Sequence, residues 1–325
     1  MRFIVRRAAI VLLLSLAPLA ATPPAAAPAA AVSFRPVVES PATDGAPTWA
    51  PDGETIAFSS LMTENDWEIY LVGAWGGEVT FFTHEPGTDI YADWSPDGQW
   101  IAFTNRRDNG DGGTEDMDLW LQSLDGDSLR CLTFWPGYDN FAAHDPAGER
   151  IAFVSDRDGE VEVWVLDLAG GEPVKVSQGL EECYHPCWSP DGQWIAFDTR
   201  DQSDPTRSRL YRVPAAGGQP EEIETGLLVA NDPHWSPDGR WLAFAGGDHP
   251  VDWDLWLRDM ETGNLVQLTN TPRFAEQSPV WNAAGTEIAY AALPHGNKDV
   301  WVAYDLPTGT AARATSWGRL KNHFR

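Results

Sequence analysis

One thirteen-residue stretch occurs three times in this chain, as YADWSPDGQWIAF (91–103), HPCWSPDGQWIAF (185–197) and DPHWSPDGRWLAF (232–244). Looser copies extend the series, and each copy has a glycine followed by an apolar triplet such as Ile-Ala-Phe. The glycines recur at intervals of 44 to 50 residues, at Gly53, Gly98, Gly148, Gly192, Gly239 and Gly285. A fixed period of this length indicates that the chain consists of six copies of one supersecondary unit.

Each unit reads as four short strands. In the turn after the first strand, proline presets its φ angle and glycine takes the positive φ that the turn requires. The triplet forms the second strand, and segments such as DLWLQSL and LVQLT form the third and fourth. Six such units predict an all-β fold, a six-bladed β-propeller of four-stranded antiparallel blades over residues 32–325. The tryptophan that precedes most of the turns is expected to pack one blade against the next.

Residues 1–31 are expected to be a signal peptide and an Ala/Pro-rich linker. Arg2, Arg6 and Arg7 precede a short apolar run at 8–20, and small-residue cleavage sites follow. This order is typical of secretory signal peptides, and the apolar run is short for a membrane span. The mature chain is therefore predicted to be periplasmic or secreted, without a membrane span.

The charge balance limits the class of partner. The chain has 48 Asp and Glu against 22 Lys and Arg, which gives a formal net charge of −26. Nucleic acids require a basic surface, so we expect no nucleic-acid partner. A basic protein surface would suit such a chain, and we expect the propeller itself to be monomeric.

The repeat W-S-P-D-G-x-x-I-A-F, followed by D-x-x-W/Y-V and then L-T, resembles the repeat of TolB-like β-propellers. Related repeats occur in the propeller domains of prolyl oligopeptidase and tricorn-type proteases. The resemblance covers roughly residues 40–316 and implies a six-bladed propeller. Those proteases carry a G-x-S-x-G nucleophile motif, and the chain contains neither this motif nor a Walker loop, zincin helix or Rossmann glycine signature. We therefore expect no catalytic residues.

Functional residues are expected where the repeats differ, in the long loops between second and third strands and at the start of each innermost strand. Five residues before the repeat tryptophan, or its equivalent His144, four units carry a carboxylate and two do not. The six residues are Asp44, Asp89, Asp139, Cys183, Ala230 and Glu276. The four carboxylates, if they ring the channel mouth, would hold a calcium ion or basic side chains of a partner. Alternatively, they are solvated residues at strand ends.

Two further groups are candidate binding residues. Tyr91, His185 and Asp232 lie two residues further along the same strands, where a histidine among carboxylates would suit acid–base chemistry or serve only as a structural residue. Trp135 and Tyr138 belong to the segment TFWPGYDNF, which would anchor a peptide or a sugar if it forms a surface patch.

Together these features favour an exported, non-catalytic binding module for a protein partner in the cell envelope. One alternative is an enzyme at the channel mouth, a carbohydrate lyase or hydrolase. Another is a structural propeller derived from a protease ancestor without its catalytic domain. How the ring closes is open, because either 32–40 or 311–316 would complete the last blade.

Overall fold

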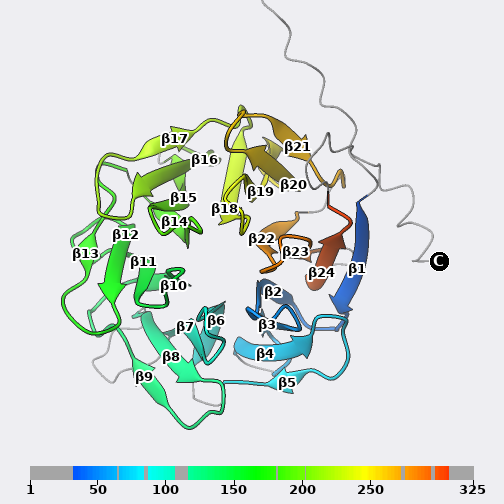
Figure 1. Ribbon diagram of the computed structural model, residues 1–325, viewed down its shortest axis with the longest axis horizontal. Helices are drawn as coiled ribbons and strands as arrows, with labels where there is room; N and C mark the ends of the chain where they lie inside the picture. Colours follow the sequence, from blue (N-terminus) through cyan, green and yellow to red (C-terminus); the bar gives the residue numbers. More distant parts are fainter. Residues whose placement is uncertain are drawn as a thin grey trace, which may run out of the picture.

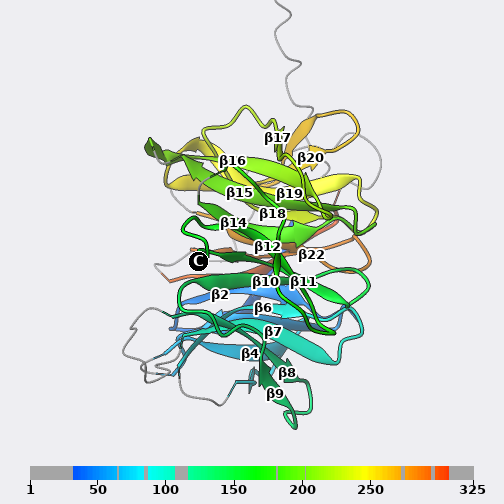
Figure 2. The same ribbon diagram turned by 90° about the vertical axis from the view of Figure 1, so that its left-hand side faces the viewer.

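The computed structural model describes residues 32–306 except 64–65, 84–86, 107–115, 181, 202, 272–274 and 294–296. Within this part, 24 strands form six four-stranded antiparallel sheets around a central channel, which confirms the predicted six-bladed β-propeller (Figure 1). Seen from the side, the strands cross the disk from one face to the other (Figure 2). The described residues include no helix that is long and apolar enough to cross a membrane. The predicted signal segment lies outside the described residues.

The strands of each blade follow one another from the channel outward. Blade 1 contains β2 (Asp44–Trp49), β3 (Thr55–Ser60), β4 (Glu68–Gly73) and β5 (Thr80–Phe81). Blade 2 contains β6 (Thr88–Trp94), β7 (Trp100–Arg106), β8 (Asp118–Ser123) and β9 (Leu129–Cys131). Blade 3 contains β10 (Asp139–His144), β11 (Arg150–Ser155), β12 (Glu162–Asp167) and β13 (Val174–Lys175).

Blades 4 and 5 repeat the pattern, and blade 6 combines both ends of the described chain. Blade 4 contains β14 (Cys183–Trp188), β15 (Trp194–Asp201), β16 (Asp204–Pro214) and β17 (Glu221–Ile223). Blade 5 contains β18 (Val229–Trp235), β19 (Trp241–His249), β20 (Asp252–Asp259) and β21 (Leu265–Gln267). Blade 6 contains β22 (Gln277–Trp281), β23 (Ile288–Ala292), β24 (Asp299–Tyr304) and, outermost, β1 (Ser33–Val38).

The repeated turn packs each blade against its neighbour on one face of the disk. Gly98 has a φ of +70°, and an added Cβ there would lie 3.2 Å from the ring of Pro51 in the preceding turn. The same relation joins Gly148 to Pro96, Gly192 to Pro146, Gly239 to Pro190 and Gly285 to Pro237. The turn of blade 6 has Ala283 in place of proline, and an added Cβ at Gly53 would meet no atom within 4 Å. All six turn glycines have a φ between 67° and 72°, which the turn requires, and in five of them the turn also packs against the proline of the preceding copy.

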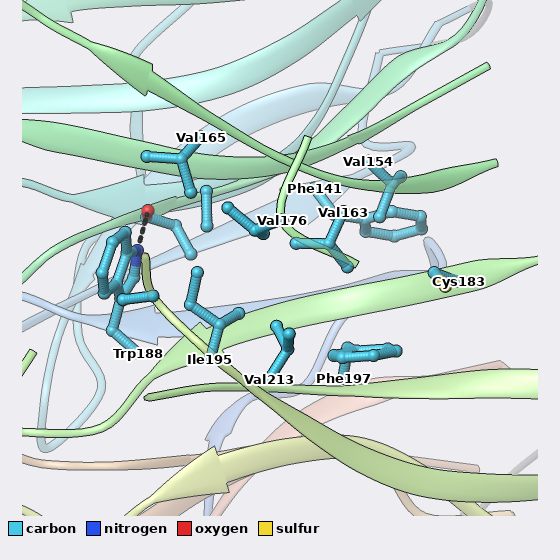
Figure 3. Packing of buried hydrophobic residues seen from close by; sticks show 13 residues of the cluster. Phe141, Val154, Val163, Val165, Val176, Cys183, Trp188, Ile195, Phe197 and Val213 are labelled. Carbon is cyan, nitrogen blue, oxygen red and sulfur yellow. Dashed lines mark hydrogen bonds between the residues drawn. The ribbon is translucent and has the colours of Figure 1, made fainter. Parts of the chain in front are cut away.

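The hydrophobic core consists of layers between adjacent blades. All six apolar triplets of the second strands are at most 1% exposed, because these strands are covered on both sides by neighbouring blades. Between blades 3 and 4, Phe141, Val163, Ile195 and Phe197 belong to one buried cluster (Figure 3). The Trp188 indole N–H in this cluster donates a 3.0 Å hydrogen bond to the Ala143 carbonyl of blade 3. The predicted role of the repeat tryptophans in packing blades together is confirmed here.

Strand β1 closes the ring by pairing antiparallel with β24. The segment 32–40 thus supplies the outermost strand of blade 6, while 311–316 lies outside the described residues. Arg35 of β1 links this blade to blade 1. Its guanidinium donates to the Ala74 carbonyl, lies 3.2 Å from the Glu287 carboxylate and stacks 4.2 Å above the Trp75 ring.

We expect Arg35→Ala to weaken the ring at its closure. Charged hydrogen bonds in partly buried positions typically contribute about 1–3 kcal/mol, so the free energy of unfolding should fall by about that amount in urea titrations. Arg209→Ala is the control, because it removes an exposed Arg209–Glu222 pair, which should contribute less than about 1 kcal/mol. Equal losses in the two variants would contradict a closing role for Arg35.

Candidate functional site: the central channel

The innermost strand of every blade has the same irregularity. Its pairing with the second strand shifts register once, at equivalent positions in all six blades. At this shift one residue per blade has a φ between 46° and 58°: Ala46, Tyr91, Phe141, His185, Asp232 and Ser278. A positive φ is uncommon for residues other than glycine, and for a bulky side chain it is strained. Six equivalent residues in this conformation indicate a shared structural device.

This device is a β-bulge, which redirects a side chain out of the regular strand alternation. In four blades the next residue is a proline, at Pro47, Pro186, Pro233 and Pro279. Proline cannot donate a hydrogen bond to a neighbouring strand, so within a sheet it is confined to edges and bulges. The bulge thereby places six unlike side chains at one level of the channel.

The bulge residues lie between two cavities in the channel. The cavity on the loop face has a volume of about 530 Å³, and the cavity on the turn face has a volume of about 240 Å³. Both are lined by Ala46, Tyr91, His185, Asp232 and Ser278. The larger cavity is also bordered by the ends of the loops between second and third strands, including Trp67, Arg106 and Trp253.

His185 is held between two carboxylates at this level. Its Nδ1 lies 2.8 Å from Asp198 Oδ1 and 3.0 Å from Asp232 Oδ1. Asp198 Oδ1 also accepts a hydrogen bond from the Asp232 amide, and Asp232 Oδ2 accepts one from the Ser278 amide. The imidazole contacts Phe141 edge-on, with the ring centroids 4.3 Å apart. The side chains of three adjacent blades therefore fix the position of His185.

The surroundings of His185 favour its charged form. Burial alone would lower the pKa of the imidazole, but the Asp232 and Asp198 carboxylates more than offset this and raise the pKa to about 9. At neutral pH both ring nitrogens then carry hydrogens. Nδ1 donates to the carboxylates, and Nε2 has no hydrogen bond to any described residue.

The four predicted channel-mouth carboxylates lie elsewhere. Asp44, Asp89, Asp139 and Glu276 are at most 1% exposed, so they do not open onto the channel as expected. The backbone N–H of each of these residues donates a hydrogen bond to a backbone carbonyl of the preceding blade. The pairs are Asp44 with Lys298, Asp89 with Trp67, Asp139 with Met117 and Glu276 with Trp253. The burial of these four carboxylates depends on how each blade packs against the preceding one, which the sequence of a single repeat does not show.

Each of these carboxylates has polar partners inside the protein. Ser60 donates to Asp44 at 2.5 Å, Asn105 donates to Asp89, Arg157 donates to both oxygens of Asp139, and Thr269 and Thr271 donate to Glu276. Burial raises the pKa of Asp44, Asp139 and Glu276, the last to about 8. The four belong to four different blades and do not gather around one point, so the structure gives no calcium cage built from them.

One group of side chains in the described part of the chain has the spacing of a metal site. It comprises His185, Asp198 and Asp232, whose ligand atoms all lie within 4.8 Å of one another. A metal ion there would have to replace the proton on His185 Nδ1, which already bonds both carboxylates.

Trp135 and Tyr138 do not join the channel site. Trp135 is 49% exposed and, with Phe134 and Pro173, borders a separate cavity of about 320 Å³. The Arg157 guanidinium lies 5.7 Å from the centroid of the Trp135 ring. Tyr138 is partly buried against the core between blades 3 and 4, and its hydroxyl accepts a 2.8 Å hydrogen bond from Asn140. Of the predicted residues, the structure brings together Tyr91, His185 and Asp232.

The sequence prediction missed several charged channel residues, among them Asp198, Arg200 and Lys298. Asp198 follows the triplet of unit four, where the other units have Ser59, Thr104, Val154, Ala245 and Ala291. Asp198 is the one charged residue at this position of the repeat, and this difference could have marked it as a candidate site residue. Arg200 lies two residues further along, and Lys298 is one of only three lysines in the chain.

We expect the His185 imidazole to titrate near pH 9 instead of near 6.5. Because folding raises this pKa, the ion pairs stabilise the protein fully below about pH 6.5, and this contribution is lost as the pH rises through about 9. The stability of the wild type, relative to His185→Gln, should therefore fall over this range in urea titrations. A difference that stays constant from pH 6 to 10 would contradict the ion pairs.

Comparison with known proteins agrees with this architecture. No curated protein sequence matches the chain. The structure is similar to that of putative TolB from Agrobacterium tumefaciens, with 23% identity and a TM-score of 0.66 over 84% of this chain and 94% of that chain. It is also similar to TolB from Acinetobacter baumannii, with 15% identity and a TM-score of 0.60 over 82% of this chain and 64% of that chain.

A third solved structure with the same fold is an oligogalacturonate lyase in complex with manganese. It has 15% identity and a TM-score of 0.57, over 87% of this chain and 99% of that chain. At these identities the three likenesses concern the fold alone. The family model described as the TolB beta propeller domain matches residues 113–313, which is more than half of the sequence. The predicted resemblance is thus confirmed, and the chain belongs to the TolB beta propeller domain family.

Proposed function

We propose that this protein is an exported, non-catalytic binding module that receives part of a protein partner in the channel from the loop face. The observation that carries the proposal is the ring of bulge residues. The turn glycines and the apolar triplets repeat from blade to blade, whereas the six bulge residues, which all lie in the channel, differ from one another. Uniform packing needs no such divergence, whereas a binding site for an asymmetric partner does.

The shape of the channel supports this proposal. The loop-face cavity, at about 530 Å³, falls within the range of ligand-binding cavities. Its rim carries Trp67 and Trp253, and large aromatic side chains provide much of the binding energy in protein interfaces. The basic N-terminal segment with its apolar run supports an envelope or secreted location.

Filling the channel should abolish capture of the partner. Ser278→Phe places at the blade 6 bulge the residue that blade 3 carries there as Phe141, so the backbone already accommodates a phenylalanine at this register. Gln193→Phe, on the exposed turn face, is the matched control. With the tagged proteins and an envelope extract, wild type and Gln193→Phe should capture the same partner, and Ser278→Phe should capture less than about a tenth as much.

Two results would contradict the proposal. If Ser278→Phe captures the partner as well as wild type does, the channel is not the binding site. If Gln193→Phe alone loses capture, the turn face binds instead. Unfolding in urea verifies that both variants fold as the wild type does.

A second candidate function is a channel enzyme acting on carbohydrate. The observation that favours it is His185 between two carboxylates, a set that could supply acid–base groups or hold a divalent metal. The test is turnover of uronate-containing oligosaccharides by wild type and His185→Ala, with and without added manganese. Turnover that His185→Ala abolishes would establish the enzyme, and absence of turnover in all conditions would remove it.

A further inference from the structure

Basic residues outnumber acidic ones around the loop-face cavity, whereas the whole chain is acidic. Acidic residues outnumber basic ones by 48 to 22 in the sequence. The described lining of this cavity nevertheless contains Arg106, Arg200 and Lys298, and its only carboxylates are Asp198 and Asp232. The cavity therefore concentrates positive charge in a protein whose overall charge repels anions.

Both carboxylates are already engaged within the protein. His185 Nδ1 lies within hydrogen-bond distance of each, and the backbone amides of Asp232 and Ser278 satisfy further oxygens. The protonated imidazole offsets part of their charge. Both carboxylates are therefore already bonded to His185 and to backbone amides.

The described side-chain contacts of Arg200 and Lys298 are with neutral groups. The Arg200 guanidinium stacks 4.8 Å from the Tyr184 ring centroid, and the Lys298 ammonium donates to the Gln277 side chain. Within the described part of the chain, neither cation has a carboxylate oxygen within 4.0 Å. Burial lowers the pKa of Lys298, and the nearby Asp232 charge offsets only part of this lowering. Holding a half-buried ammonium without a carboxylate costs free energy that an anionic ligand would recover.

The other lining groups suit a peptide chain. Trp67, Tyr91 and Trp253 offer flat apolar faces, while Asn231 and Gln277 offer amides that can bond a peptide backbone. Cationic and aromatic groups in one cavity are typical of sites that bind an acid side chain together with the apolar stem or backbone beside it.

We infer that the loop-face cavity binds an acidic peptide segment, with Arg200 and Lys298 as the charge partners of its carboxylate. The inference rests on the proposed function, because it specifies the chemistry of the partner segment that enters the channel. It differs from the expectation of a basic partner, which follows from the net charge of the chain and not from the cavity.

Calorimetric titration with blocked tetrapeptides tests the inference. Acetylated and amidated tetraglutamate is the probe, tetraglutamine and tetralysine are its neutral and basic counterparts, and trigalacturonate supplies carboxylates on a sugar. Wild type should bind tetraglutamate more tightly than the other three ligands. Arg200→Gln and Lys298→Gln should each raise the Kd for tetraglutamate by about 10- to 100-fold, as expected for loss of a charge-assisted contact.

Arg207→Gln is the matched control, since Arg207 is exposed on the same blade, pairs with Asp204 and does not line the cavity. It should leave the Kd within about twofold. Tighter binding of tetralysine or of trigalacturonate, or equal effects of the Arg207 and Arg200 substitutions, would overturn the inference. Urea unfolding of each variant confirms that the comparison is made between folded proteins.

The result separates this inference from the proposed function. If Ser278→Phe abolishes capture of the partner but tetraglutamate neither binds nor competes with it, the channel binds a partner of other chemistry and only the inference fails. If tetraglutamate binds with the expected dependence on Arg200 and Lys298 but the captured partner is indifferent to Ser278→Phe, the cavity chemistry stands and the proposed function fails.

Discussion

The channel of this propeller depends on a backbone constraint that is repeated six times. Each innermost strand contains one residue with positive φ at a shift of register, and these residues meet at one level between the two cavities. Left-handed conformations of non-glycine residues cost about 1–3 kcal/mol each and persist only where the surrounding structure enforces them. Here side chains of the preceding blade accept hydrogen bonds from the bulge amides of Tyr91, Phe141, Asp232 and Ser278, and the bulges bring six different side chains to one level of the channel.

The fold was predictable from the sequence because its determinants are local and repeated. Glycines such as Gly98 mark each turn, and the buried triplets mark strands that are covered on both faces. The ring closure was not predictable, because the choice between two terminal segments depends on which of them pairs with β24 in three dimensions. Arg35, which ties β1 to blade 1, carries no sequence signal of this role.

The site was predictable only in part. Tyr91, His185 and Asp232 were identified because they sit where the blades diverge, and the bulge explains why that register reaches the channel. Asp44 and Glu276 lie two residues before the bulge of their blades and are buried. Residues two apart on a regular strand share a face, so it is the bulge that turns the later residue into the channel. Arg200 and Lys298 come from different blades, and their meeting at one cavity follows from the ring geometry alone.

In this propeller a repeated scaffold carries a ring of unlike side chains, and we propose that a partner reaches this ring from the loop face. Photo-crosslinking in cells that produce the protein tests this proposal, with benzoylphenylalanine in place of Trp67 on the rim of the loop-face cavity and, separately, in place of Gln193 on the turn face. Trp67 is already a large aromatic residue, so the probe replaces it without filling the channel. We expect a crosslinked protein adduct from position 67 and none from position 193, and an adduct from position 193 alone, or from neither position, would contradict entry from the loop face.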